Sequence, residues 1–210
     1  MKQEKFWDKV SDKYDKTEKR LEIIFHKVLE NTKKYLTAGD VVLDFGCGTG
    51  TMTVEIARHV KEIHAIDISS KMLEYAKQNV IERHIENVNF IQATLFDTPY
   101  EKESFDVILA FGILHLLKDN RQIIQKIGEL LKPGGLLISS TPCLAEKMTL
   151  LTKFQFYPFL LLSKTGLINQ YLKRFKITEL DNLISAGNLQ IIKHEKIFHR
   201  LTAYFVAAKK

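Results

Sequence analysis

Short apolar segments alternate with segments of helical periodicity through the first two thirds of this sequence. Strands are expected at 41–45, 62–67, 88–93, 105–111 and 136–141. Helices, in which apolar residues recur three or four positions apart, are expected at 51–60, 70–84 and 121–131. Strands that are joined by helices pair in parallel and bury both faces of their sheet. The pattern therefore predicts an α/β domain with a doubly wound, mostly parallel sheet and helices on both faces.

The final third of the sequence predicts a different strand pairing. Segments 189–198 and 202–209 are separated by a tight connection, which favours an antiparallel pair and completes a sheet of seven strands. Ahead of them, Thr178 and Asp181 have the spacing of a capping box and predict a short helix that ends at Gly187. We expect residues 1–210 to form one domain, because a chain of 210 residues buries one substantial core.

Two further local signals predict where elements begin. Ser70 is expected to cap the helix over 70–84, because serine accepts a hydrogen bond from the free N–H groups of a first turn. The sequence KPGG at 132–135 predicts a turn ahead of the fifth strand. In such a turn Pro133 presets one dihedral angle and Gly134 takes a positive φ.

The composition is that of an ordinary soluble chain, with 45% hydrophobic and 27% charged residues. The N-terminal residues contain no apolar core of a signal peptide, and the longest apolar run, at 154–162, is too short to span a bilayer. The two cysteines, Cys47 and Cys143, indicate neither a disulfide framework nor a metal-binding spacing. We therefore expect a cytoplasmic protein with no transmembrane segment and no metal ion.

The sequence VVLDFGCGTG places Gly46, Gly48 and Gly50 directly after the first expected strand. It lacks the GK[ST] ending of a nucleoside-triphosphate loop and the GxGxxG spacing of dinucleotide-binding folds. The helix that follows favours an anionic group at its N-terminus, whereas the carboxylate of Asp44 favours an ammonium group. Asp67 ends the second strand, at the position of an acid that hydrogen-bonds ribose hydroxyls. A ligand with a ribose, an ammonium and a carboxylate but no phosphate is S-adenosylmethionine.

Four motifs occur in a fixed order: VVLDFGCGTG, AIDISSKMLEYAK with Asp67, SFDVILAFGILHLL at 104–117 and LLKPGGLLISS at 130–140. Together, over residues 35–141, they resemble class I S-adenosylmethionine-dependent methyltransferases. The segment FWDKVSDKYDK at 6–16 resembles the N-terminal helix that many small-molecule members fold over the cofactor, and favours the group of the ubiquinone and menaquinone C-methyltransferases. The resemblance implies a Rossmann-like fold, an N-terminal helical cap over 1–34, and methyl transfer that leaves S-adenosylhomocysteine.

The resemblance also implies roles for residues of the cofactor site. The methionine part would lie against Gly46, Cys47 and Gly48, with backbone contacts from Phe111. Asp67 would bind the ribose. Tyr14, together with Trp7, would close the site from above.

For the adenine ring, the resemblance implies contacts with Ile68 and Met72 on its two sides. Thr94 stands where many members have an acidic residue that contacts the adenine amino group. A threonine hydroxyl substitutes only weakly for a carboxylate, so the backbone of Leu95 would also serve this contact.

The acceptor is expected to meet residues 142–176, which follow the fifth strand and combine aromatic, aliphatic and basic residues. Such a segment suits a lid over a hydrophobic acceptor, with a basic rim for an anionic acceptor or a membrane surface, and it equally suits a cap that only packs onto the sheet. His115 follows the fourth strand and is the candidate general base, although it can also serve only to support its loop. The expected acceptor is a small, hydrophobic or anionic metabolite.

Other functions stay open at this point. Residues 141–210 carry 11 Lys or Arg against four Asp or Glu, a net charge of +7, which would suit an RNA or protein acceptor. The fourth strand ends in AFGILH instead of the Asn/Asp-Pro-Pro-aromatic sequence of base-methylating relatives, so nucleic acid is a weaker alternative. A nicotinamide-dependent oxidoreductase and a protein that binds S-adenosylmethionine without turnover are the remaining alternatives. The methylated atom and the oligomeric state are not indicated.

Overall fold

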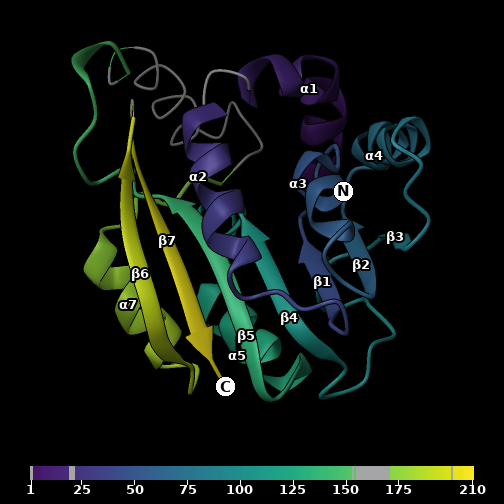
Figure 1. The fold of residues 1–210 in the computed structure, drawn as a ribbon. Coiled ribbons are helices and arrows are strands. Elements are labelled where there is room, and N and C mark those ends of the chain that lie inside the picture. The colour runs from purple at the N-terminus through teal and green to yellow at the C-terminus, as the bar shows by residue number, and fades with distance from the viewer. Residues whose placement is uncertain (1, 19–21, 153, 155–170, 200) are drawn as a thin grey trace.

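The computed structural model describes residues 2–18, 22–152, 154, 171–199 and 201–210 (Figure 1). These residues form one sheet with the strand order β3-β2-β1-β4-β5-β7-β6. Its strands are β1 (Val41–Phe45), β2 (Glu62–Asp67), β3 (Val88–Gln92), β4 (Phe105–Phe111), β5 (Leu131–Pro142), β6 (Gln190–Phe198) and β7 (Thr202–Lys209). The predicted seven-stranded, Rossmann-like sheet is confirmed.

The pairing of the strands determines where a ligand can bind. Strand β1 runs parallel to both β2 and β4, and β7 runs antiparallel to both β5 and β6. The chain moves outward from β1 through β2 to β3, and then returns to the other side of β1 to form β4. Ligands of such sheets bind beyond the carboxyl ends of the strands at this reversal. In Figure 1 these carboxyl ends point toward α1 (Lys2–Glu18).

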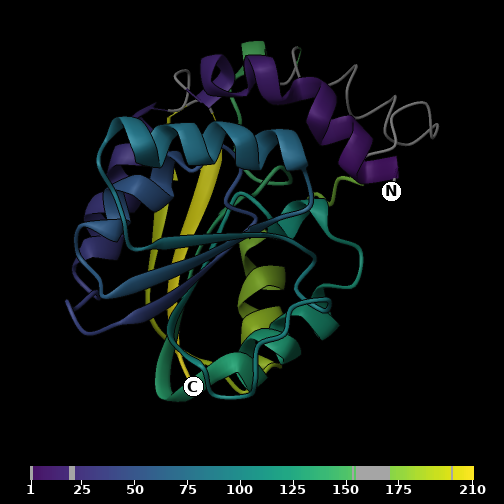
Figure 2. The ribbon, with the colours of Figure 1, turned by 90° about the vertical axis from the view of Figure 1, so that its right-hand side faces the viewer.

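Helices cover both faces of the sheet, as Figure 2 shows. On one face, α2 (Glu22–Lys33) and α3 (Thr51–Ala57) bury apolar residues against β1, β2, β4 and β5. On the other face, α5 (Asn120–Leu130) and α7 (Ile177–Ser185) do the same. In α5, Ile123, Ile127 and Leu130 recur at helical spacing and are buried. This arrangement confirms the doubly wound sheet with helices on both faces.

The remaining helices lie around the carboxyl end of the sheet. Helix α4 (Ser70–Glu82) packs beside β2 and β3. Helix α1 packs on α4 and crosses beyond the ends of the strands, whereas α2 lies on the face of the sheet (Figures 1 and 2). Within the expected N-terminal cap, therefore, only α1 lies over the strand ends. Across the described residues, none of the helices has the length and apolar character required to cross a membrane.

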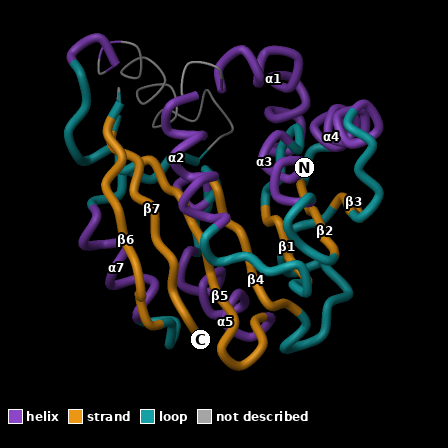
Figure 3. The backbone as a smooth tube through the Cα atoms, viewed as in Figure 1, coloured by secondary structure: helices purple, strands orange, loops and turns teal. Residues whose placement is uncertain are grey.

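A loop, and no helix, connects β3 to β4 over residues 93–104 (Figure 3). Tyr100 anchors this loop, because its ring packs edge-on against Phe105 at 4.9 Å and against His64 at 5.3 Å between ring centroids. Edge-to-face aromatic contacts of this kind stabilise beyond the area that they bury. The cluster fixes the loop to β2 and to the start of β4.

Two predicted helix caps are wrong by one or two residues. Helix α4 is capped by Ser69, whose hydroxyl accepts a hydrogen bond of 3.2 Å from the N–H of Met72, and not by Ser70. Helix α7 begins at Ile177, one residue before the predicted Thr178. The carboxylate that reaches back over its first turn belongs to Glu179, which accepts from the N–H of Lys176 at 3.0 Å.

The remaining differences in this region have equally local causes. Asp181, predicted as part of the capping box, instead accepts a hydrogen bond of 2.7 Å from the hydroxyl of Tyr204. This bond joins α7 to the sheet. Strand β5 already begins at Leu131, because Leu131 pairs with Phe105 ahead of a shift in register. Gly134 lies in this irregular start and has the predicted positive φ, of 80°.

Candidate active site

A cavity of about 650 Å³ lies beyond the carboxyl ends of β1, β2 and β4. Its lining comes from α1, β1, β2, α4, β4 and α5 and from the loops between them, with α1 above and the start of α5 at one side. The residues predicted for the cofactor site that line it are Trp7, Tyr14, Gly46, Gly48, Asp67, Ile68, Met72, Thr94, Leu95 and Phe111. A cavity of this size is typical of sites for small molecules.

The glycine loop turns sharply at the end of β1 and uses its N–H groups within the protein. Gly46 and Cys47 both donate to the carbonyl of Ile66, at 2.8 and 3.1 Å, and Gly50 donates to the carbonyl of Cys47. The N–H of Gly48 donates to Asp67 at 3.0 Å. These four N–H groups are therefore not presented to a phosphate, which agrees with the absence of a phosphate-binding motif.

Two of the glycines are required for different reasons. Gly48 has φ of +56° and lines the cavity opposite Tyr14, whose ring would lie 3.6 Å from an added Cβ. Gly50 does not line the cavity. An added Cβ there would lie 2.9 Å from the Cβ of Ala76, so Gly50 permits close packing of α3 against α4. Together with its positive φ of +77°, this helix contact favours glycine at the third position.

Asp67 is held at the end of β2 by two backbone hydrogen bonds. Its Oδ2 accepts from Gly48 at 3.0 Å and its Oδ1 accepts from Ser69 at 2.9 Å. Burial raises the pKa of Asp67, and these hydrogen bonds oppose the rise. Each carboxylate oxygen can accept more than one hydrogen bond, so both keep capacity for ligand hydroxyls. The geometry is that expected of a residue that receives a diol.

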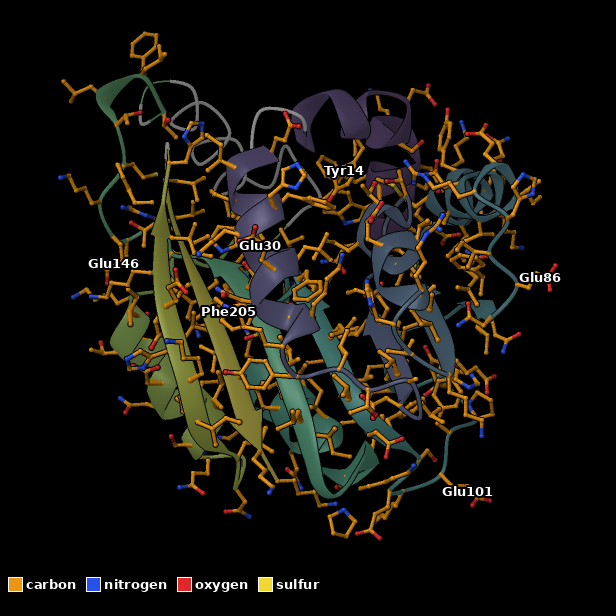
Figure 4. All side chains as sticks on the ribbon, in the orientation of Figure 1. Tyr14, Glu30, Glu86, Glu101, Glu146 and Phe205 are labelled. Carbon is orange, nitrogen blue, oxygen red and sulfur yellow. The ribbon has the colours of Figure 1, made fainter. Side chains whose placement is uncertain are left out.

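Helix α1 closes the cavity from above, as the resemblance implies. Figure 4 shows Tyr14 extending from α1 toward the ends of the strands. Trp7 lies on the same side of the helix, with its ring centroid 6.2 Å from that of Tyr14. On another side of α1, Asp8 accepts a hydrogen bond of 2.6 Å from the hydroxyl of Ser69. The helix thus presents aromatic rings to the cavity and a carboxylate to α4.

Two predicted residues, Asp44 at the end of β1 and Cys47 within the glycine loop, do not line the cavity. Asp44 is buried, and its Oδ2 accepts a hydrogen bond of 2.7 Å from the hydroxyl of Thr53. Burial raises the pKa of Asp44 to about 6. Burial, reinforced by the carboxylates of Asp44 and Asp67, also raises the pKa of the Cys47 thiol, which argues against a nucleophilic cysteine.

Beyond Asp67, the cavity is lined by the first turn of α4 and by residues of two loops. Met72 of α4 and Leu95 are almost fully buried, and Ile68 also lines this part of the cavity. The hydroxyl of Thr94 donates to Asp97 at 2.6 Å. Thr94 therefore has a carboxylate partner close to the position where relatives have an acidic residue of their own.

The opposite end of the cavity is apolar. It is lined by residues that the sequence analysis did not single out, which are Gly112, Ile113, Leu116, Leu117, Lys118, Asp119, Ile123 and Tyr171. Of these, Ile113 packs against the glycine loop, because an added Cβ at Gly46 would lie 2.9 Å from its side chain. Lys118 and Asp119 are exposed and give this end one charge of each sign. The position of Lys118 and Asp119 shortly after β4 was the sequence signal that could have identified these two residues.

His115 lies in a 3-10 turn, η2 (Leu114–Leu116), and does not line the cavity. Its carbonyl accepts a hydrogen bond of 2.7 Å from the N–H of Lys173. Burial lowers the pKa of His115 to about 4, and its Nδ1 has no hydrogen-bond partner among the described residues. At neutral pH the ring is therefore uncharged and only weakly basic.

Only the ends of the predicted lid over 142–176 belong to the described residues. Tyr171 lines the cavity, and Phe175 is fully buried in the core beside α5 and α7. Lys153 and residues 155–170, which include Lys164, lie outside the described residues. In the parts of the chain that the structure describes, no three His, Cys, Asp or Glu side chains are grouped to hold a metal ion.

The sheet topology, with a cavity beyond the carboxyl ends of its central strands, defines a Rossmann-like domain. Residues 36–181 match the protein family described as a methyltransferase domain. Because this match extends over more than half of the chain, the chain belongs to this family.

Curated relatives agree with this assignment. The demethylmenaquinone methyltransferase of Bacillus mycoides is 31% identical over 139 residues, which are 63% of this chain and 58% of the relative. This chain therefore spans a little more than half the length of that protein. The resemblance to the menaquinone methyltransferase group, first noted in the sequence motifs, is confirmed.

Solved structures share the fold at lower sequence identity. The YcgJ protein from Bacillus subtilis superposes with a TM-score of 0.70 at 19% identity, over 88% of this chain and 98% of that one. A SAM-dependent methyltransferase from Aquifex aeolicus superposes with a TM-score of 0.67 at 16% identity, over 86% of this chain and 87% of that one. At these identities the comparison supports the fold alone.

Proposed function

We propose that this chain is an S-adenosylmethionine-dependent methyltransferase that acts on a small, hydrophobic or anionic metabolite. The single observation that carries the proposal is the contact between Asp67 and the N–H of Gly48 at the floor of the cavity. The carboxylate of Asp67 would bind the diol of a ribose. The N–H groups of the adjoining loop already donate hydrogen bonds within the protein, so the site suits a nucleoside without phosphate. Membership of the methyltransferase-domain family supports the same ligand.

The residues around the cavity fit S-adenosylmethionine in three parts. Asp67 would receive the ribose hydroxyls, and the surfaces of Ile68, Met72 and Leu95 would enclose the adenine ring. Gly46 and Gly48 would leave room for the methionine part beside Phe111. Asp44, Cys47 and Gly50 would support this half of the site from behind the loop, with Asp44 providing negative charge near an ammonium group.

Bound S-adenosylmethionine supplies a sulfonium whose methyl group is already activated for transfer. The protein then has to align the acceptor with that methyl group and exclude water. Trp7 and Tyr14 on α1 would exclude water from above, and Ile113 and Leu116 would position an apolar acceptor from the side. Most of the rate enhancement would come from holding the acceptor close to the methyl group, without a strongly basic residue.

The apolar end of the cavity favours a hydrophobic acceptor that carries one polar or acidic group. Leu116, Leu117 and Ile123 offer apolar surface, and Lys118 and Asp119 add one charge of each sign, of which Lys118 would pair with an acidic group. The name of the Bacillus mycoides relative, a demethylmenaquinone methyltransferase, supports an acceptor of this kind. We also place the reaction in the cytoplasm, since both Cys47 and Cys143 are free thiols.

Calorimetric titration of the purified protein with S-adenosylmethionine, S-adenosylhomocysteine and NADH tests the cofactor. We expect saturable binding of the first two and none of NADH. Binding of NADH alone would establish the oxidoreductase alternative and overturn the proposal. Binding of S-adenosylmethionine without transfer to any fraction of a cell extract would favour the non-catalytic alternative.

A further inference from the structure

Large apolar side chains are exposed along the segment that follows β5. Leu150 is 84% exposed, Leu151 64% and Phe154 81%, and we call these three residues the apolar tip. Single exposed apolar residues are common on protein surfaces, but three within five positions form a patch of the kind that marks an interaction site. None of the three lines the cavity.

The structure holds the base of the apolar tip firmly to the sheet. Met148 pairs with Leu201 in an antiparallel bridge, and the carbonyl of Lys147 accepts a hydrogen bond of 3.0 Å from the hydroxyl of Thr202. The ammonium group of Lys147 lies 5.6 Å above the ring centroid of Phe198, which is itself 47% exposed. The tip therefore projects from a fixed point at the end of β6.

In the described part of the chain, the exposed charged side chains next to Phe198 at the base of the apolar tip are basic. Lys147 and Lys196 are exposed next to Phe198. The nearby acids are engaged elsewhere, because Glu146 accepts from the N–H of Ile177 at 3.1 Å and Glu195 accepts from Asn31 at 2.8 Å. Exposed apolar residues bordered by lysines match the two layers of an anionic bilayer surface, in which acyl chains lie beneath phosphate groups.

The apolar tip lies at the same end of the molecule as the cavity. In Figure 1 the segment after β5 extends past the end of β6 on the side of the sheet where α1 covers the strand ends. Tyr171 and Lys118 line the cavity, which lies beyond the carboxyl ends of β1, β2 and β4. A surface that contacted the tip would therefore face the end of the molecule that holds the cavity.

We propose that Leu150, Leu151 and Phe154 insert into the surface of an anionic lipid bilayer, with Lys147 and Lys196 against the lipid phosphates. This docking would bring an apolar acceptor dissolved in the bilayer close to the site. The delivery of an acceptor to the site rests on the proposed function. Docking itself does not, because it requires no cofactor and no methyl transfer.

Cosedimentation of the full chain with vesicles tests this proposal. One set of vesicles contains phosphatidylcholine alone, and the other contains about 30% phosphatidylglycerol. We expect binding to the anionic vesicles that weakens with salt, because each lysine near the surface adds attraction that ions screen. The triple variant L150S/L151S/F154S should bind at least about tenfold more weakly, since three apolar side chains are lost.

A matched control replaces an apolar residue that is equally exposed elsewhere. Ile81 on α4 is 71% exposed, and I81S should leave vesicle binding unchanged. The variant K147E/K196E should lose binding to anionic vesicles. Circular dichroism and S-adenosylmethionine titration should be unaffected in the triple variant, which separates failure of docking from failure of the fold or of the proposed function.

Three outcomes would overturn the proposal. Equal binding by the triple variant and the parent would remove the role of the tip. Equal binding to neutral and anionic vesicles would remove the role of the lysines. Self-association in sedimentation velocity that the triple variant abolishes, with no vesicle binding, would make the tip an interface between copies of this chain.

Discussion

The carboxylate of Asp8 accepts a hydrogen bond of 2.6 Å from the hydroxyl of Ser69, which joins α1 to the N-terminus of α4. The N–H of Ser69 donates in turn to Asp67 at 2.9 Å. Helix α1 is therefore linked through one residue to the carboxylate that we propose to hold the ribose. Trp7, the neighbour of Asp8, lines the cavity. Docking of α1 and the shape of the cofactor site should be coupled.

We expect the variant D8A to weaken binding of S-adenosylmethionine by about tenfold. A hydrogen bond to a charged group contributes about 1.5–3 kcal/mol. We expect part of this loss to appear as lower affinity and the rest as lower stability of the N-terminus of α4. Trp7 is the only tryptophan, so its fluorescence on titration reports whether α1 still closes over the site. The matched control is D12A, because Asp12 also joins α1 to α4, through the hydroxyl of Tyr75 at 2.9 Å, but at an exposed position. Equal losses in both variants would contradict a specific role of Asp8.

The variant D67N should reduce the affinity for S-adenosylmethionine by roughly 10- to 100-fold. An asparagine amide would set an N–H group against the N–H of either Gly48 or Ser69, and it removes the charge. Calorimetry measures the loss. As a control, E86Q changes a carboxylate that points into solvent at the edge of the molecule, as Figure 4 shows, and should leave the affinity unaltered. Unchanged affinity in D67N would refute the ribose assignment.

Asp44 provides a prediction for pH. Its pKa in the folded chain, about 6, lies above the ordinary value of 3.8. Its contribution to stability is therefore greatest below about pH 4 and is lost as the pH rises through 6, because the buried charge then has to be accommodated. We expect D44N to melt at the same or a higher temperature than the parent at pH 7.5.

The same substitution should weaken the cofactor site. If Asp44 provides negative charge near the ammonium group, affinity for S-adenosylmethionine should increase as the pH rises through about 6, and D44N should flatten this dependence. Titrations of both proteins at several pH values measure it. A parent and a variant with identical affinities and pH profiles would exclude Asp44 from ligand binding.

We expect H115A to keep kcat within a few-fold of the parent. His115 does not line the cavity, and a pKa of about 4 makes its ring a weak base. Steady-state kinetics with an identified acceptor provide the measurement. A loss of 100-fold or more in kcat, with an unchanged melting temperature, would restore His115 as the general base.

The arrangement of strands and helices was predictable because hydrophobic periodicity records which face of each element is buried. Element ends were less predictable, since they depend on which of several adjacent polar residues reaches a backbone N–H. Ser69 and Ser70 are adjacent serines, and the contacts of Ser69 with Met72, Asp67 and Asp8 distinguish them in the structure. Likewise, Asp181 was free to bond Tyr204 because Glu179 already caps α7.

Most residues that the sequence predicted for the cofactor site line one cavity, because that prediction rests on glycines and an acid at fixed spacing. The apolar half of the cavity was not predictable in this way. Ile113, Leu116 and Leu117 have the same character in a cavity wall as in a core, and periodicity does not separate the two. Gly50 shows a second limit of the sequence pattern: it does not line the cavity, and its positive φ and its close approach to Ala76 are structural reasons for glycine that the spacing did not indicate.

The most direct test of methyl transfer uses S-adenosylmethionine with a radiolabelled methyl group, the purified protein and a host-cell extract. After incubation the label is partitioned between organic, small-molecule and macromolecular fractions. The account predicts label in the organic or small-molecule fraction, which D67N greatly reduces. Label that precipitates with RNA or protein would contradict a small-molecule acceptor, and would make the basic residues of 141–210 the surface that binds the acceptor.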